Sequence, residues 1–149
     1  MPTAARLIAA LFLGLTGLVL AFQMRGAAIS ADNLVLPNFI EITAVFIGVT
    51  TGWLVVGPRS GRGWQFAAST GITGGIVLAV GLFLSIGAHE MLRRTLRNRY
   101  DTAIEALLAI FDIALKDLIA LSTTGVLLPL IAGAVLTGFA SEVASRNWK

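Results

Sequence analysis

Four predominantly apolar stretches divide this chain, and each is long enough to cross most or all of a lipid bilayer. They comprise residues 7–24, 39–56, 66–88 and 121–141. At about 1.5 Å rise per residue, helices of these lengths approach or match a hydrocarbon core about 30 Å thick. Glu41, in the first turn of the second stretch, is the one charged residue among them. The pattern predicts an all-α membrane protein with four transmembrane helices in a single domain, residues 1–149, the other helices flanking the third.

Residues 101–119 have a different pattern, with two kinds of side chain at helical spacing on opposite sides. The polar side has Asp101, Glu105, Asp112 and Lys116, and the apolar side has Ile104, Leu107, Leu108, Phe111, Leu115 and Leu118. This density of charge disfavours a membrane span. We therefore predict an amphipathic helix that lies in the membrane interface between the third and fourth spans.

Charged and glycine-rich segments mark the expected ends of the spans. A basic start followed by an apolar run is also typical of a cleaved signal peptide, but residues 7–24 can span a locally thinned bilayer. We expect an uncleaved first helix that ends at Arg25. Residues 57–64 are rich in glycine and arginine but match neither the P-loop nor the dinucleotide-binding fingerprint. We interpret them as a tight turn at the membrane edge, with arginines near lipid headgroups.

Small residues recur every fourth position in the second and third spans. They are Gly48 and Gly52, then Ala67, Gly71, Gly75 and Ala79. Such stripes allow two helix backbones to approach closely. We expect them to form helix–helix contacts, either with a second copy of the chain or with another membrane protein.

The composition supports lipid as the solvent and excludes several kinds of chemistry. Hydrophobic residues make up 56% of the chain and charged residues only 13%, against about 25% in soluble domains. The chain has no cysteine and a single histidine, so we expect no disulfide, no metal site and no cofactor. The net charge of +3 comes mainly from arginines at helix ends. This is typical of anchoring to membrane lipids, and we expect no nucleic-acid partner.

An even number of spans puts both chain ends on one side of the membrane, and the start of the second span near the end of the third. Lysines and arginines divide almost equally between the two sides, so the positive-inside rule selects neither orientation. The same parity gathers a polar set at one membrane surface: Glu41, His89 and Glu90, with Arg93, Arg94, Arg97 and Arg99.

Two interpretations of this polar set differ in chemistry. The arginines could grip an oxyanion while His89 or a carboxylate handles protons. Alternatively, the arginines contact lipid phosphates and pair locally with Glu90 and Asp101, and we favour this second interpretation because charge at a helix end costs little. No ionisable residue lies at the middle of a span, which disfavours a proton-coupled transporter.

Several sequence blocks carry a resemblance to a known family. They are Met1-Pro2-Thr3-Ala4-Ala5-Arg6-Leu7, Gly52-Trp53, the turn glycines and arginines at 57–63, Gly71-Ile72-Thr73-Gly74, Glu90-Met91-Leu92-Arg93-Arg94, and Arg97, Arg99, Tyr100, Asp101, Glu105, Ala106 and Leu107. In these blocks the chain is similar to the TrgA family of tellurium-resistance membrane proteins of alphaproteobacteria. It departs from that family at Thr102-Ala103-Ile104, which replaces a Gly-Pro turn, and at Arg146-Asn147-Trp148, where the family pattern implies paired arginines. The resemblance implies a role in tellurite resistance in the bacterial cytoplasmic (inner) membrane.

Together these observations predict a non-enzymatic, multi-pass membrane protein. Without cysteine or cofactor ligands, the chain by itself is not expected to reduce tellurite. We expect it to act by oxyanion tolerance or as a helper of a partner. The alternative is an accessory or structural subunit packed against a larger membrane complex.

Overall fold

The computed structural model covers residues 1–149 and describes all of them except 1–3, 31–35, 96–102, 122–123 and 148–149. The described residues form α1 (Ala4–Ser30), α2 (Ile40–Thr51), α3 (Trp64–Thr95), α4 (Ala103–Leu121) and α5 (Thr124–Asn147). A π-helical segment, Gly52–Val56, and a 3-10 turn, Gly57–Arg59, continue α2 towards α3. No strand occurs among the described residues, so the predicted all-α class is confirmed.

Four of these helices are long and apolar enough to cross a membrane, at Ala4–Ala28, Ile40–Arg59, Trp64–Arg93 and Thr124–Asn147. Large apolar side chains on their outer faces are exposed, for example Leu11, Phe46, Ile76 and Leu128. Such surfaces are unfavourable in water but suit hydrocarbon, where helices satisfy their own backbone hydrogen bonds. The chain is therefore a multi-pass membrane protein, as the sequence predicted.

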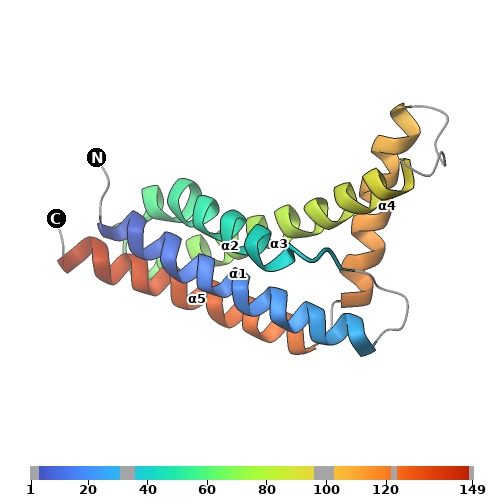
Figure 1. The fold of residues 1–149 in the computed structure, drawn as a ribbon. Helices are drawn as coiled ribbons and strands as arrows, with labels where there is room; N and C mark the ends of the chain where they lie inside the picture. The colour runs from blue at the N-terminus through green and yellow to red at the C-terminus, as the bar shows by residue number, and fades with distance from the viewer. Residues whose placement is uncertain (1–3, 31–35, 96–102, 122–123, 148–149) are drawn as a thin grey trace.

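The four long helices form a closed ring in which each packs along two neighbours. Figure 1 shows this ring from the side. α1 lies along α2 and α5, and α3 lies along α5 and α2. The start of α1 and the end of α5 lie at the same end, here called the terminal end. α4 packs against α3 at the opposite end, here called the distal end. The helices thus form a ring and do not simply flank α3, because α1 makes its extensive contacts with α2 and α5.

The predicted small-residue positions of the second span, Gly48 in α2 and Gly52 in the π-helical segment, bring its backbone against α1. A methyl group on Gly48 would overlap the carbonyl oxygen of Leu13, and one on Gly52 would overlap that of Ala9. Only a residue without a Cβ atom permits this approach. These two glycines therefore join two helices of the same chain.

The stripe on α3 packs against α5 in the same way. A methyl group on Gly71 would overlap the carbonyl oxygen of Ala134, and one on Gly75 would lie 2.7 Å from the Ala134 Cβ. Conversely, a methyl group on Gly138 would overlap the carbonyl oxygen of Ala67. Ala79, the last member of the stripe, lines a groove between α3 and α4. Except at Ala79, the stripe is thus occupied by α5 of the same chain.

The first helix extends beyond its predicted end. Arg25 does not end the first helix, because α1 continues to Ser30 through helix-favouring alanines at 27 and 28. α3, whose predicted span ends at residue 88, continues into the basic segment as expected, as far as Thr95. Charged side chains do not interrupt helical hydrogen bonding, so the end of an apolar run marks a change of solvent and not the end of a helix.

α4 contacts α3 through a face other than its predicted apolar side. Ile113 and Ala114 are buried, and the carbonyl oxygen of Ile110 lies close to Gly87 of α3. Ile104, Leu108, Phe111 and Leu115, which belong to the predicted apolar side, are exposed.

Candidate functional site

The interior of the bundle contains hydroxyl groups that bond within their own helices. Thr16 donates to the carbonyl oxygen of Phe12 at 2.8 Å, and Thr137 donates to that of Gly133 at 2.7 Å. Among the described residues, the one charged side chain that is buried is Glu142, which lies at the terminal end. The described part of the bundle therefore has no ionisable group midway between its ends.

At the distal end, Glu41 pairs with an arginine that sequence analysis had placed outside the site. Nη2 of Arg25 lies 2.7 Å from Oε1 and 2.9 Å from Oε2 of Glu41, and 3.5 Å from the carbonyl oxygen of Asn38. Because α1 continues past residue 24, Arg25 reaches the first turn of α2. The pair joins these two helices at the level where they leave the apolar region.

His89 and Glu90 have partners of their own. The His89 ring meets Phe39 edge to face, with centroids 5.0 Å apart, so the end of α3 lies beside the start of α2. Glu90 accepts a hydrogen bond from Nη1 of Arg93 at 3.3 Å, one turn along α3. The predicted set Glu41, His89 and Glu90 therefore shares one end of the bundle but has three separate partners. Arg97 and Arg99 lie outside the described residues, as does the side chain of Arg94.

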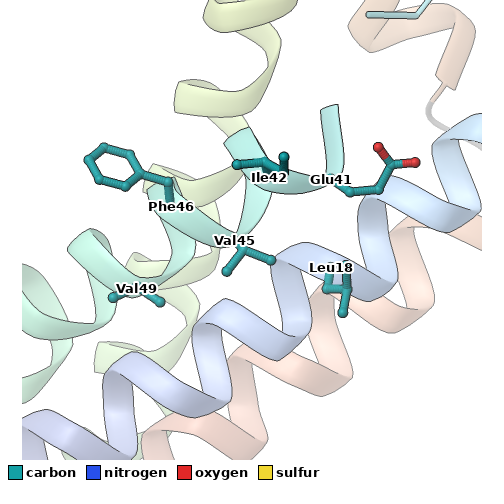
Figure 2. Close-up of a pocket in the computed structure, with 6 residues that line it drawn as sticks. All are labelled: Leu18, Glu41, Ile42, Val45, Phe46 and Val49. Atoms are coloured by element: carbon teal, nitrogen blue, oxygen red, sulfur yellow. The ribbon is translucent and has the colours of Figure 1, made fainter. Parts of the chain in front are cut away.

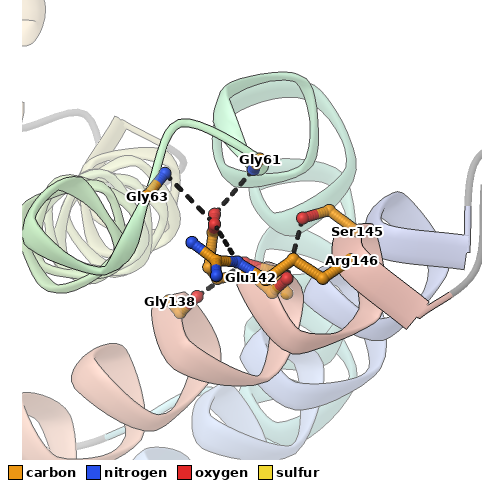
Figure 3. A network of polar contacts seen from close by, with 7 residues as sticks. Gly61, Gly63, Gly138, Glu142, Ser145 and Arg146 are labelled. Atoms are coloured by element: carbon orange, nitrogen blue, oxygen red, sulfur yellow. Dashed lines mark hydrogen bonds and ion pairs between the residues drawn. The ribbon is translucent and has the colours of Figure 1, made fainter.

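The most completely built polar site lies at the terminal end and centres on Glu142, which sequence analysis left unassigned (Figure 3). The amide of Gly61 donates to its Oε2 at 2.6 Å, and the amide of Gly63 donates to its Oε1 at 3.1 Å. Nε of Arg146 donates to Oε1 at 3.0 Å, one turn along α5. The carboxylate is only 2% exposed, so these donors replace its water.

The turn between α2 and α3 has the backbone geometry that holds this carboxylate. Gly61 and Gly63 have φ angles of +90° and +109°, a region that side chains with a Cβ disfavour. This conformation points both amides at the end of α5, next to the electropositive start of α3. Trp64 extends the site, since its ring lies 5.1 Å from the Arg146 guanidinium carbon and 5.9 Å from the Phe139 ring.

This geometry changes the interpretation of the glycine-rich turn. Its amides bind an anion, but that anion is a carboxylate of the same chain. The site ties the α2–α3 turn to α5, and Arg59 and Arg62 on the same turn remain exposed. The sequence pattern at this site is only Glu142 four positions before Arg146. That pattern does not identify Gly61, 81 residues earlier, as a partner of the carboxylate.

Searches against protein-family models, curated proteins and solved structures find no match to this chain. The fold, with its polar groups at the two ends, places this chain in the class of multi-pass α-helical membrane proteins. Within the described residues, no three histidine, aspartate or glutamate side chains come together as metal ligands.

Proposed function

We propose that this chain is a non-enzymatic integral membrane protein of a bacterial cytoplasmic membrane that supports tolerance of tellurite. It acts on the oxyanion at the membrane surface or as a helper of a partner. The link to tellurite rests on the resemblance of its sequence blocks to the TrgA family, above all the arginine-rich residues 90–101.

The observation that carries the non-enzymatic part is the position of charge. The described charged side chains lie towards the ends of the bundle or on α4, and hydroxyls in the interior bond to their own helices. Bond-making chemistry needs convergent reactive groups in a sheltered site, and an ion pathway needs polar groups through the membrane. Glu142, the buried exception, has its oxygens occupied by Gly61, Gly63 and Arg146.

Tellurite tolerance of cells with and without the chain tests the proposal. We expect lower tolerance without the chain and restored tolerance when it is supplied again. A variant with Arg93, Arg94 and Arg97 replaced by glutamine then separates the two routes at equal expression. Lost tolerance favours direct action on the oxyanion, because guanidinium groups bind oxyanions strongly. Retained tolerance favours a partner.

A matched control replaces the exposed arginines at the opposite end, Arg59 and Arg62, with glutamine. If both variants lose tolerance equally, general surface charge is responsible and Arg93, Arg94 and Arg97 have no special role. If removal of the whole chain leaves tolerance unchanged, the proposed function is wrong.

A second candidate function, an accessory subunit of a larger membrane complex, is favoured by the surface of α4. Phe111, Leu115 and Leu118 line an apolar groove of about 210 Å³ together with Val80 and Phe83 of α3. A helix of a partner could cover this surface. Purification in mild detergent distinguishes the two functions: a stable stoichiometric partner favours the subunit, whereas a lone monomer or homo-oligomer argues against it.

A further inference from the structure

An open groove runs along the outside of the bundle between α1 and α2 (Figure 2). Its volume is about 400 Å³ and its wall is apolar. The lining residues are Leu18 from α1 and Ile42, Val45, Phe46 and Val49 from α2, with Glu41 at one end. An apolar groove on a membrane-spanning surface is accessible to the hydrocarbon chains of lipids.

The length of this groove is close to the hydrocarbon thickness of one leaflet, and so suits one acyl chain. From Glu41 to Val49, α2 rises about 12 Å at about 1.5 Å per residue. One leaflet contributes about 15 Å of hydrocarbon, half of a core about 30 Å thick. Glu41 lies in the first turn of α2, at the end of the span, so the groove starts at headgroup level and runs towards the bilayer centre.

Glu41, at one end of the groove, pairs with Arg25, so a negative and a positive group lie side by side next to that end. One nitrogen of Arg25, Nη2, contacts both oxygens of Glu41, at 2.7 and 2.9 Å. Nε of Arg25 is buried and has no hydrogen-bond partner among the described residues, although the side chain as a whole is 40% exposed. A guanidinium has five donors in a planar fork that suits phosphate. The exposed part of the Arg25 guanidinium therefore has donors left for an acceptor from a lipid headgroup, whereas the buried Nε is out of reach of one.

Glu41 determines which headgroup fits beside that phosphate. Its side chain is 22% exposed, and an ionised carboxylate accepts about four hydrogen bonds, more than Arg25 supplies. The carboxylate repels a headgroup that carries only negative charge. It attracts a primary ammonium, which has three donors, and it attracts a quaternary ammonium less because that group has none.

We propose that the groove between α1 and α2 binds one acyl chain of an ethanolamine phospholipid, with its phosphate on Arg25 and its ammonium on Glu41. The headgroup's negative and positive charges then oppose the positive and negative side chains of the protein. This lipid site is independent of any action on tellurite.

Native mass spectrometry of the full chain in mild detergent tests the proposal. The probes are equimolar ethanolamine, glycerol and choline phospholipids with identical acyl chains. We expect the ethanolamine lipid to form the dominant adduct. Glu41→Gln should weaken that adduct roughly tenfold relative to the glycerol lipid, because a hydrogen bond to a charged group contributes about that factor. Equal adducts of all three lipids on the wild-type chain would overturn the proposal.

Two further variants separate the groove from general effects of charge. Val45→Phe keeps both charged residues but fills the groove, so it should reduce adducts of all three lipids. Asp112→Asn removes an acid from a comparable pair, Asp112 with Lys116 at 2.6 Å, which has no place in this groove. It should leave the ethanolamine preference unchanged. If Val45→Phe retains the wild-type adducts, the lipid does not occupy the groove and the proposal is wrong.

Discussion

Glu142 shows how a single buried carboxylate can hold distant parts of a membrane protein together. Its donors are the amides of Gly61 and Gly63 and the guanidinium of Arg146. Removing an ion from water is costly, and this cost is offset only when several well-aligned donors replace the water. The four groups therefore act as a unit in which each depends on the others.

Glu142→Gln should destabilise the chain by about 2 kcal/mol, because an amide gives Gly61 and Gly63 at most one good acceptor in place of two. Thermal unfolding in mild detergent measures the loss as a lower midpoint. The matched control is Asp112→Asn in an exposed ion pair of α4, where we expect a change below about 1 kcal/mol. Equal midpoints for Glu142→Gln and the wild type would contradict this account of the site.

Gly63→Ala tests the geometry of the turn separately from its contacts. A Cβ on Gly63 meets no atom within 4 Å, so its effect comes from the φ angle of +109°. We expect a loss of about 1–2 kcal/mol. Gly26→Ala is the counterpart. An added Cβ on Gly26 also meets no atom within 4 Å, but this residue lies inside the helix α1. There alanine should stabilise the chain by about 0.5–1 kcal/mol, giving opposite shifts of the unfolding midpoint. Shifts of the same sign would rule out the role of φ.

At the scale of helices, glycine and alanine set the distances between neighbours. Gly48 and Gly52 let α2 touch α1, while Gly71 and Gly138 bring α3 and α5 together. Lipid supplies no hydrophobic driving force between helices, so close backbone packing is a main source of stability. These contacts are internal, which leaves the α4 surface and the outer grooves for lipids or partners.

Gly71→Ala should separate α3 from α5, because its methyl group would overlap the backbone of Ala134 and backbone cannot move aside as a flexible side chain can. We expect a loss of about 1–3 kcal/mol. At Gly125, in the first turn of α5, the nearest atom to an added Cβ is 4.0 Å away, so Gly125→Ala should not destabilise the chain. Comparison of the two unfolding midpoints checks this. A Gly71→Ala chain as stable as the wild type would mean that the α3–α5 spacing is adjustable.

At the scale of the whole molecule, the ring of four long helices places the start of α1 beside the end of α5, and the first turn of α2 beside the end of α3. The contact between the Phe39 and His89 rings shows directly that the start of α2 lies beside the last turns of α3. The two ends of the bundle differ in chemistry. The terminal end contains the Glu142 site and exposed arginines, and the distal end contains the Arg25–Glu41 pair and α4.

The four spans should place Asn38 and Arg62 on opposite sides of the membrane. Because the chain has no cysteine, single substitutions Asn38→Cys and Arg62→Cys give labelling sites without background. A membrane-impermeant maleimide applied to sealed vesicles should label one of the two variants and not the other. Both should react after the membrane is dissolved. Labelling of both variants in intact vesicles would contradict the four-span topology.

The sequence by itself determined the fold class, the four spans and the helical segment between the third and fourth. Apolar runs and charge are local properties, and bilayer thickness converts their lengths into spans. The sequence also placed Glu41, His89 and Glu90 at one end, through the even number of spans alone. Their proposed chemistry stays a prediction, as do the roles of Arg93, Arg94, Arg97 and Arg99 and the link to tellurite.

Only the tertiary structure decided which groups are partners. The order of helices in the ring, the pairing of Arg25 with Glu41 and the burial of Glu142 all depend on contacts between residues far apart in the chain. A carboxylate beside an arginine has the same local pattern whether it faces water or two glycine amides 81 and 79 positions earlier. Its environment exists only when helix packing brings the turn and α5 together, because hydrogen bonds act over about 3 Å and not along the sequence.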